Sequence, residues 1–211
     1  MGTRGVGAAG TITALALVAT CACRVATVRP LDEKGSPAAG AVPASGPFDA
    51  AAFVASIWEP EVLRALDTAA DIGTIAGTAA SVAGDSTGRP RALVVRGEGR
   101  VVAVDTRSRS GTATVALDRE ARATVVLPVG PVITGTAIRD ALPALGFDRF
   151  VNQIQHADVG NELNARIERE VLQALDRAAL RGRHVRFAGM ASFEEGRPPT
   201  VTPVRLEVEK P

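Results

Sequence analysis

Aromatic side chains are scarce in this sequence, which has no tyrosine, a single tryptophan and an aromatic content of 3%. Platforms on which bases or sugar rings stack are therefore poorly supplied. An excess of one charge is also missing, because 24 basic and 23 acidic residues leave a formal net charge of +1. Nucleic acid is not expected as a partner, since its binding proteins usually carry a clustered excess of Lys and Arg.

Cysteine occurs only at Cys21 and Cys23. The rest of the chain can therefore form no disulfide and no cysteine-based metal site. The two histidines, His156 and His184, lack the spacings typical of zinc sites, and no serine lies in a G-x-S-x-G motif. We therefore expect no metal, no other cofactor and no enzymatic activity.

A long apolar run is also lacking, because the stretch from Val6 to Ala19 is shorter than the roughly 20 residues that a transmembrane helix needs. Arg4 precedes this stretch and small residues follow it, which is the three-part layout of a secretory signal. We predict a cleaved signal peptide over residues 1–22.

The two cysteines offer two registers for a bacterial lipoprotein signal, in which a small or aliphatic triplet precedes the cysteine that receives diacylglycerol. Cys23 is favoured because the small residue Ala22 comes directly before it, and Cys21 stays open as the alternative. An ordinary cleaved signal with incidental cysteines is also open. Acyl chains on the terminal cysteine would hold the protein at the periplasmic face of a membrane.

Residues 23–47 are rich in Pro, Gly, Ala and Ser and show no hydrophobic period, which is typical of a flexible tether. Such a coil would reach roughly 25–30 Å. Residues 48–211 are long enough for one domain of ordinary size, which we expect to be a single periplasmic α+β domain.

Hydrophobic spacing predicts helices at the start of this domain, with Asp49 as a cap and Pro60 opening a second helix. Alternating apolar and polar residues predict short antiparallel strands at 92–97, 100–106, 112–117, 121–128, 184–193 and 200–209. The break at Gly97-Glu98-Gly99 is typical of a bulge or a tight bend.

A long helix is predicted from about Asp148 to Ala179, before the last two strands, with Gly182 as its C-terminal cap. Its apolar residues recur every four positions. Glu162 and Glu170 are spaced for surface ion pairs with Arg166.

Polar residues suited to binding gather in two places. Arg139 and Asp140 lie in a short helix expected after Gly130–Thr136, a segment that has the glycine spacing of a phosphate loop but lacks its lysine. We interpret that segment as a rigid connection in which Thr134 or Thr136 caps the helix. The second group is the amide cluster Asn152, Gln153, Asn161 and Asn164. For both groups a structural hydrogen-bond network is the favoured alternative to binding, and His156 is expected as a satisfied core histidine.

Several stretches resemble the family of predicted periplasmic lipoproteins known as domain of unknown function 2291. They are residues 23–25, 48–63, 94–117, 128–164 and 201–208. The resemblance implies an α+β domain built around a small antiparallel β-barrel similar to an oligonucleotide/oligosaccharide-binding (OB) fold, and it favours Cys23 as the anchor. It also implies a link to sugar ABC transporters, and the long Pro/Ala-rich segment after Lys34 departs from the family pattern.

The expected function is that of a non-catalytic accessory or binding lipoprotein associated with carbohydrate ABC transport. Its binding face would be bounded by the Gly130–Asp140 loop and the Asn152–Asn164 helix. The alternative is a structural or assembly factor that binds an envelope protein, and an envelope hydrolase ranks third. The ligand, the oligomeric state and the choice of inner or outer membrane stay open.

Overall fold

The computed structural model describes residues 47–76, 91–120 and 123–209, all within one compact unit that runs from Pro37 to Pro211. A second unit, Met1–Ser36, lies outside the described residues, as do the predicted signal peptide, both cysteines and nearly all of the tether. In the described part of the chain, none of the helices has the length and apolar character needed to cross a membrane.

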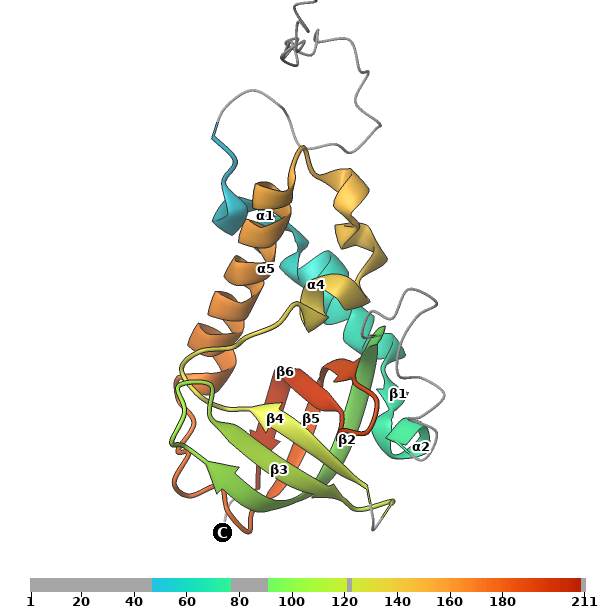
Figure 1. Cartoon of the computed structure of the whole chain (residues 1–211), viewed down its shortest axis with the longest axis vertical. Coiled ribbons are helices and arrows are strands. Elements are labelled where there is room, and N and C mark those ends of the chain that lie inside the picture. Colours follow the sequence, from blue (N-terminus) through green and yellow to red (C-terminus); the bar gives the residue numbers. More distant parts are fainter. Residues whose placement is uncertain (1–46, 77–90, 121–122, 210–211) are drawn as a thin grey trace, which may run out of the picture. The chain divides into compact units, whose positions relative to one another are not determined.

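Helices and sheet are both present, which confirms the α+β prediction (Figure 1). The helical elements are α1 (Ala50–Ile57), η1 (Trp58–Leu63), η2 (Leu66–Thr68), α2 (Ile72–Ala76), α4 (Ala137–Ala141), η3 (Pro143–Leu145), η4 (Phe147–Arg149), α5 (Gln153–Ile167) and η5 (Glu168–Leu172). The strands are β1 (Ala70–Asp71), β2 (Arg91–Asp105), β3 (Thr112–Leu117), β4 (Thr124–Pro128), β5 (His184–Phe193) and β6 (Thr200–Val208). Helices α1, α4 and α5 lie together above the sheet in Figure 1.

The six strands form one sheet in the order β1-β2-β3-β4-β6-β5, and a further pairing of β2 with β5 closes a ring of hydrogen-bonded strands. Most neighbours are antiparallel, as predicted, whereas β4 meets β6 in parallel at a single residue pair, Val126 and Thr200. The short β1 adds to the outer side of β2 in parallel. Strand β2 is the longest because it pairs with β5 along its first part and with β3 along its second.

The predicted break at Gly97-Glu98-Gly99 is not observed, because β2 runs through it without interruption. The irregularity in pairing lies further on, between Val101 and Ala103. The two glycines instead allow close approach. A Cβ atom at Gly97 would lie 2.8 Å from the Phe187 ring, and one at Gly99 would lie too close to the backbone of Ala116.

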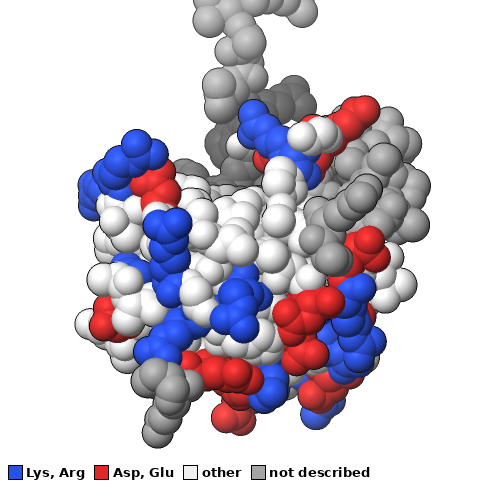
Figure 2. Space-filling model, turned by 90° about the horizontal axis from the view of Figure 1, so that it is seen from below, with Lys and Arg blue, Asp and Glu red and all other residues white. Residues whose placement is uncertain are grey.

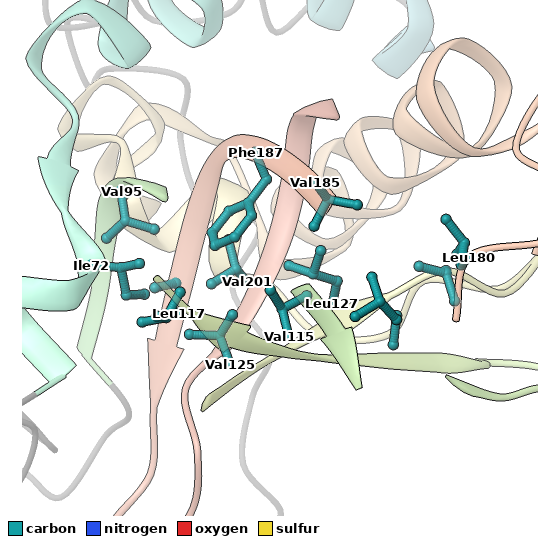
Figure 3. Close-up of a cluster of buried hydrophobic side chains, with 14 of the residues drawn as sticks. Ile72, Val95, Val115, Leu117, Val125, Leu127, Leu180, Val185, Phe187 and Val201 are labelled. Carbon is teal, nitrogen blue, oxygen red and sulfur yellow. The ribbon is translucent and has the colours of Figure 1, made fainter. Parts of the chain in front are cut away.

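Inward-facing side chains of the ring form the first hydrophobic core (Figure 3). Val95, Val115, Val125, Val185 and Val201 are all essentially inaccessible to solvent. Valine predominates because β-branched side chains pack well on a pleated surface. Phe187 and Phe193 supply the bulk that these smaller residues lack.

A second core lies between the outer face of the sheet and the helices. Met190 and Val204 on the strands pack with helix residues such as Val62 and Leu163, all nearly or fully buried. Trp58 is also buried there, and the guanidinium carbon of Arg166 lies 4.3 Å from the centre of its ring. This contact ties α5 to the helical segment that follows α1.

The helix predictions were right in part. The Asp49 side chain caps α1 by accepting a hydrogen bond from Ala52 N at 3.0 Å. Pro60 does not open a second helix, because it lies inside the π-helical η1 that continues α1. Where η1 ends, Arg64 N donates to Glu59 O, five residues back, and such a widened turn accommodates a residue without an N–H group.

The predicted helix over residues 148–179 is shorter in the structure. Its regular part begins at Gln153 and ends at Leu172. Asp176 then accepts hydrogen bonds from the backbone of Ala178 and Ala179, which offers these amides an alternative to the helix. Gly182 is therefore not the helix cap, although its φ of 81° places it in a left-handed turn before β5.

The surface ion pairs also differ in one respect. Arg166 contacts Glu170 at 2.8 Å, as predicted. Glu162 instead pairs with Arg169 at 2.9 Å. The Arg166 guanidinium also lies over the ring of Trp58.

Candidate functional site

Part of the outer face of β2, β5 and β6 is left uncovered by the helices. Because side chains alternate along a strand, every second residue of these three strands points outward. Where the helices pack, the outward residues are apolar, as with Val94 and Met190. Where they do not, the outward residues are mostly charged.

Strand register arranges these outward residues in rows across the three strands. In one row Arg96 pairs with Ala188, which pairs in turn with Arg205. Residues directly opposite in antiparallel strands share a face, so the two arginines flank a small alanine at a separation of about two strand spacings, about 10 Å. In the next row Arg186 lies between Glu98 and Glu207.

A pocket of about 530 Å³ opens over these rows. Its wall beyond β2 is formed by Asp71, Gly73 and Arg119, and Phe187 and Leu117 contribute apolar surface. Such a volume falls within the range of about 300–1,000 Å³ that is usual for small-molecule sites. In the face seen in Figure 2, Lys/Arg and Asp/Glu side chains interleave around an uncharged area.

Two of the four arginines in the pocket are engaged by carboxylates. Arg186 lies 3.3 Å from Glu98, and Arg119 lies 3.5 Å from Asp71. Arg96 and Arg205 are exposed and form no ion pair with any residue in the described ranges. The pocket therefore presents two uncompensated guanidinium groups on either side of Ala188.

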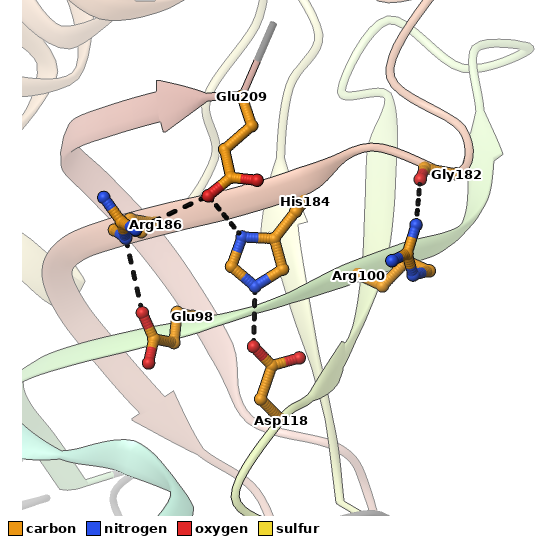
Figure 4. A network of polar contacts seen from close by, with 7 residues as sticks. All are labelled: Glu98, Arg100, Asp118, Gly182, His184, Arg186 and Glu209. Carbon is orange, nitrogen blue, oxygen red and sulfur yellow. Dashed lines mark hydrogen bonds and ion pairs between the residues drawn. The ribbon is translucent and has the colours of Figure 1, made fainter. Parts of the chain in front are cut away.

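A polar network borders the pocket at the next row (Figure 4). His184 Nε2 lies 2.6 Å from an Asp118 carboxylate oxygen, and its Nδ1 lies 3.3 Å from Glu209. The hydrogen bond to Asp118 raises the pKa of His184 above its ordinary value, and the nearby negative charges act in the same direction. Arg186 joins the network by contacting Glu209 at 3.4 Å.

The predicted pair Arg139 and Asp140 lies in α4, away from this pocket. The Arg139 side chain is only 15% exposed and contacts Asp140 at 2.9 Å, and it also donates to the backbone oxygen of His156 at 3.4 Å. The Thr136 hydroxyl donates to Asp140 rather than capping the helix backbone. His156 is half-buried, and its Nε2 forms a hydrogen bond with Leu145 O at 3.1 Å, in agreement with the interpretation as a satisfied core histidine.

The predicted amide cluster is spread along α5. Asn152 caps the helix by accepting from Gln155 N at 2.9 Å, and Asn164 donates to Gly135 O at 2.9 Å, which holds the connection between β4 and α4. Gln153 and Asn161 are exposed. The structure thus gives Arg139, Asp140, Asn152 and Asn164 structural contacts, and binding by the cluster stays a prediction.

Sequence reasoning did not single out Arg96, Arg205, Asp118 or the network around His184. One signal was available, because Arg205, Glu207 and Glu209 alternate with apolar residues and Arg96, Glu98 and Arg100 recur at the same period. The sequence could not show which residues share a row across the sheet, since this depends on the register of strands about 90 residues apart in sequence. Within the described ranges, no three His, Cys, Asp or Glu side chains are grouped closely enough to hold a metal ion.

Comparison with solved structures supports the fold. A crystal structure of an OB-fold protein from Thermotoga maritima is similar with a TM-score of 0.58 at 18% identity, covering 78% of this chain and 100% of that one. This likeness confirms the predicted OB-like fold. A search of curated proteins found no match. The family model for predicted periplasmic lipoproteins, domain of unknown function 2291, matches residues 12–207. The chain therefore belongs to this family of predicted periplasmic lipoproteins.

Proposed function

We propose that this lipoprotein is a non-catalytic binding component at the periplasmic face of a membrane, and that its ligand is a small sugar derivative with an anionic group, such as a sugar acid or a sugar phosphate. The observation that carries the proposal is the pair of uncompensated arginines, Arg96 and Arg205, in a pocket of about 530 Å³. The physiological setting would be carbohydrate ABC transport, as the family resemblance implies.

The arginine pair suits a carboxylate or a phosphate. A guanidinium group presents a planar fork of N–H donors that matches the oxygens of these anions. Ala188 lies between Arg96 and Arg205 in the strand register, and its small side chain leaves space above the sheet. An anion bound there would be held from both sides.

The carboxylates of the pocket suit the rest of such a ligand. Glu98, Glu207 and Asp71 also line the pocket, and carboxylate oxygens accept hydrogen bonds from sugar hydroxyl groups. Glu98 pairs with Arg186 and Asp71 pairs with Arg119, at 3.3 and 3.5 Å. Carboxylates that are paired with arginine are better suited to accepting hydrogen bonds from a ligand than to proton transfer in catalysis. This supports a binding role.

The test is a thermal-shift screen of the lipidated full chain in nanodiscs. Uronic acids and sugar phosphates are compared with neutral sugars of the same stereochemistry. A ligand present at 100 times its Kd stabilises the folded state by about 2.7 kcal/mol, which corresponds to an increase in Tm of roughly 5–10 °C for a domain of this size.

Variants locate the site. Arg96→Gln and Arg205→Gln should each reduce the shift caused by the anionic sugar, because each removes one guanidinium fork. Arg64→Gln, at an exposed position after η1, is the matched control and should leave the shift unchanged. A shift that survives both pocket substitutions would place the ligand elsewhere. A flat screen combined with co-purification of an envelope protein would favour the assembly-factor alternative.

A further inference from the structure

Exposed large hydrophobic side chains are concentrated in one short segment. Among the described residues they are Val102, Phe147, Val151 and Ile154, with exposures of 45%, 51%, 59% and 71%. Three of these four lie between positions 147 and 154. Scattered single apolar residues are ordinary on a protein surface, whereas a group of them marks an interaction surface.

Residues of this segment pack against the helical core. Phe147 makes an edge contact with the ring of His156 at 5.4 Å, and Phe150 lies 5.1 Å from the same ring. Phe150 is itself 7% exposed and belongs to the helical core. The segment that carries the exposed side chains of Phe147, Val151 and Ile154 is therefore anchored by packing at the start of α5.

The tether enters the domain at the same end that carries the exposed apolar residues. Phe48, the second described residue, packs against Phe150 with ring centres 6.3 Å apart. Figure 1 shows that α1 and α5 both begin at the end of the helical layer that is remote from β3. The chain that comes from the lipid-anchored N-terminus thus enters the domain beside the exposed apolar residues.

Within the segment itself, the charges balance. Asp148 and Arg149 are both exposed and of opposite sign, and Asn152 and Gln153 are neutral. An attraction to this surface would therefore be mainly apolar and nearly independent of salt. A protein whose anchor already lies in a bilayer keeps such a surface within the roughly 25–30 Å reach of its tether.

We propose that Phe147, Val151 and Ile154 form a membrane-contact surface, which inserts into the interfacial region of the bilayer that holds the lipid anchor. The domain is then oriented by two attachments, the acyl chains and this surface. Tethering raises the effective concentration of the surface at the membrane, so a contact too weak to bind a free domain is sufficient here.

The test uses the lipidated full chain in phosphatidylcholine vesicles with an environment-sensitive dye on Ile154→Cys. Val102→Cys is the matched control, since Val102 is the other exposed large hydrophobic residue and lies on β2. A chain without an introduced cysteine measures any background labelling at the N-terminus. We expect a blue shift and several-fold stronger quenching by lipids that carry a shallow spin label for the dye at 154 than for the dye at 102.

Two further measurements define the nature of the contact. The dye at 154 should respond equally at low and high salt and with or without anionic lipid. Phe147→Ser combined with Val151→Ser should reduce the quenching at least twofold, and circular dichroism checks that the domain remains folded. Equal quenching at 154 and 102 would overturn the proposal. So would a dye at 154 that is shielded only when envelope proteins are added, because the surface would then bind a protein.

Discussion

His184 connects three chain segments that are distant in sequence. It lies at the start of β5, whereas Asp118 follows β3 and Glu209 follows β6. The side chain of His184 is 19% exposed, so its contacts with the two acids are partly shielded from water. We therefore expect this histidine to make the stability of the fold depend on pH.

The sign of this sensitivity follows from the raised pKa of His184. A group whose pKa is higher in the folded state stabilises the fold below its unfolded value, 6.5, and this stabilisation is lost as pH rises through the folded pKa. We compare the free energy of unfolding of the native protein with that of His184→Gln. We expect the advantage of the native protein to decrease as pH rises from 6 to 8.5. Urea denaturation across this range measures the difference.

Asp118→Asn provides the matched control, because it removes the largest cause of the raised pKa while leaving the histidine in place. It should shift the pH dependence toward lower pH. A pH profile identical in the native protein, His184→Gln and Asp118→Asn would contradict the assignment.

Asp105 and Arg107 form a local pair at the end of β2. Arg107 donates two side-chain hydrogen bonds to Asp105, at 3.1 and 2.8 Å, and lowers the pKa of that carboxyl to about 2. Arg107→Gln should return the pKa of Asp105 toward its ordinary value of 3.8. Titration of the carboxyl by NMR measures this, and an unchanged value in the variant would rule out the pairing in solution.

At the scale of elements, the pairing of β5 with β6 requires a glycine. A Cβ atom at Gly189 would meet the backbone oxygen of Thr202 at a distance that no real contact reaches. The register also shifts between Ala188 and Gly189. Gly189→Ala should therefore lower the free energy of unfolding by about 1–3 kcal/mol or more, as measured by urea denaturation.

Gly160→Ala is the counterpart within α5. Its Cβ atom would lie 3.7 Å from Arg139, an ordinary contact, and alanine is favoured over glycine in a helix by about 0.5–1 kcal/mol. This variant should be neutral or more stable. Equal losses in Gly189→Ala and Gly160→Ala would show that crowding at the strand crossing is not the cause.

Strand positions were largely predictable because the alternation of apolar and polar residues is a local property. The uninterrupted course of β2 was not, since whether Gly97 and Gly99 break a strand depends on Phe187 and Ala116, which are distant in sequence. The position of Pro60 inside a helical run was not predictable for a related reason. A buried Val62 and Trp58 keep the helical run continuous through packing that overrides the local preference of proline.

The candidate site was less predictable than the fold. Amide and charged residues near α4 and α5 were predicted as a candidate binding cluster because they lie close together in sequence. Several of them form hydrogen bonds with the backbone that stabilise the fold. Arg96 and Arg205 are 109 positions apart and are brought together only through β5. Sequence periodicity can show that a side chain faces outward, but it cannot show which other strands share its row.

At the scale of the whole molecule, the predicted anchor determines where the domain works. Cys23→Ser should abolish metabolic incorporation of labelled fatty acid, because it removes the acceptor thiol of the favoured register. Cys21→Ser should leave labelling unchanged. Intact mass of the mature chain gives a second measurement, and labelling that survives Cys23→Ser would move the anchor to Cys21.

The 15 residues of α5 and the 5 residues of η5 form one rod about 30 Å long. Ile154 lies in its first turn, Phe147 and Val151 come just before it, and its last turn contacts β6 of the strand ring. If the first turn rests on lipid, the rod sets the height at which the arginine pocket stands above the bilayer. A transporter or receptor that receives a ligand from this pocket would then need its own opening at the same height above the bilayer.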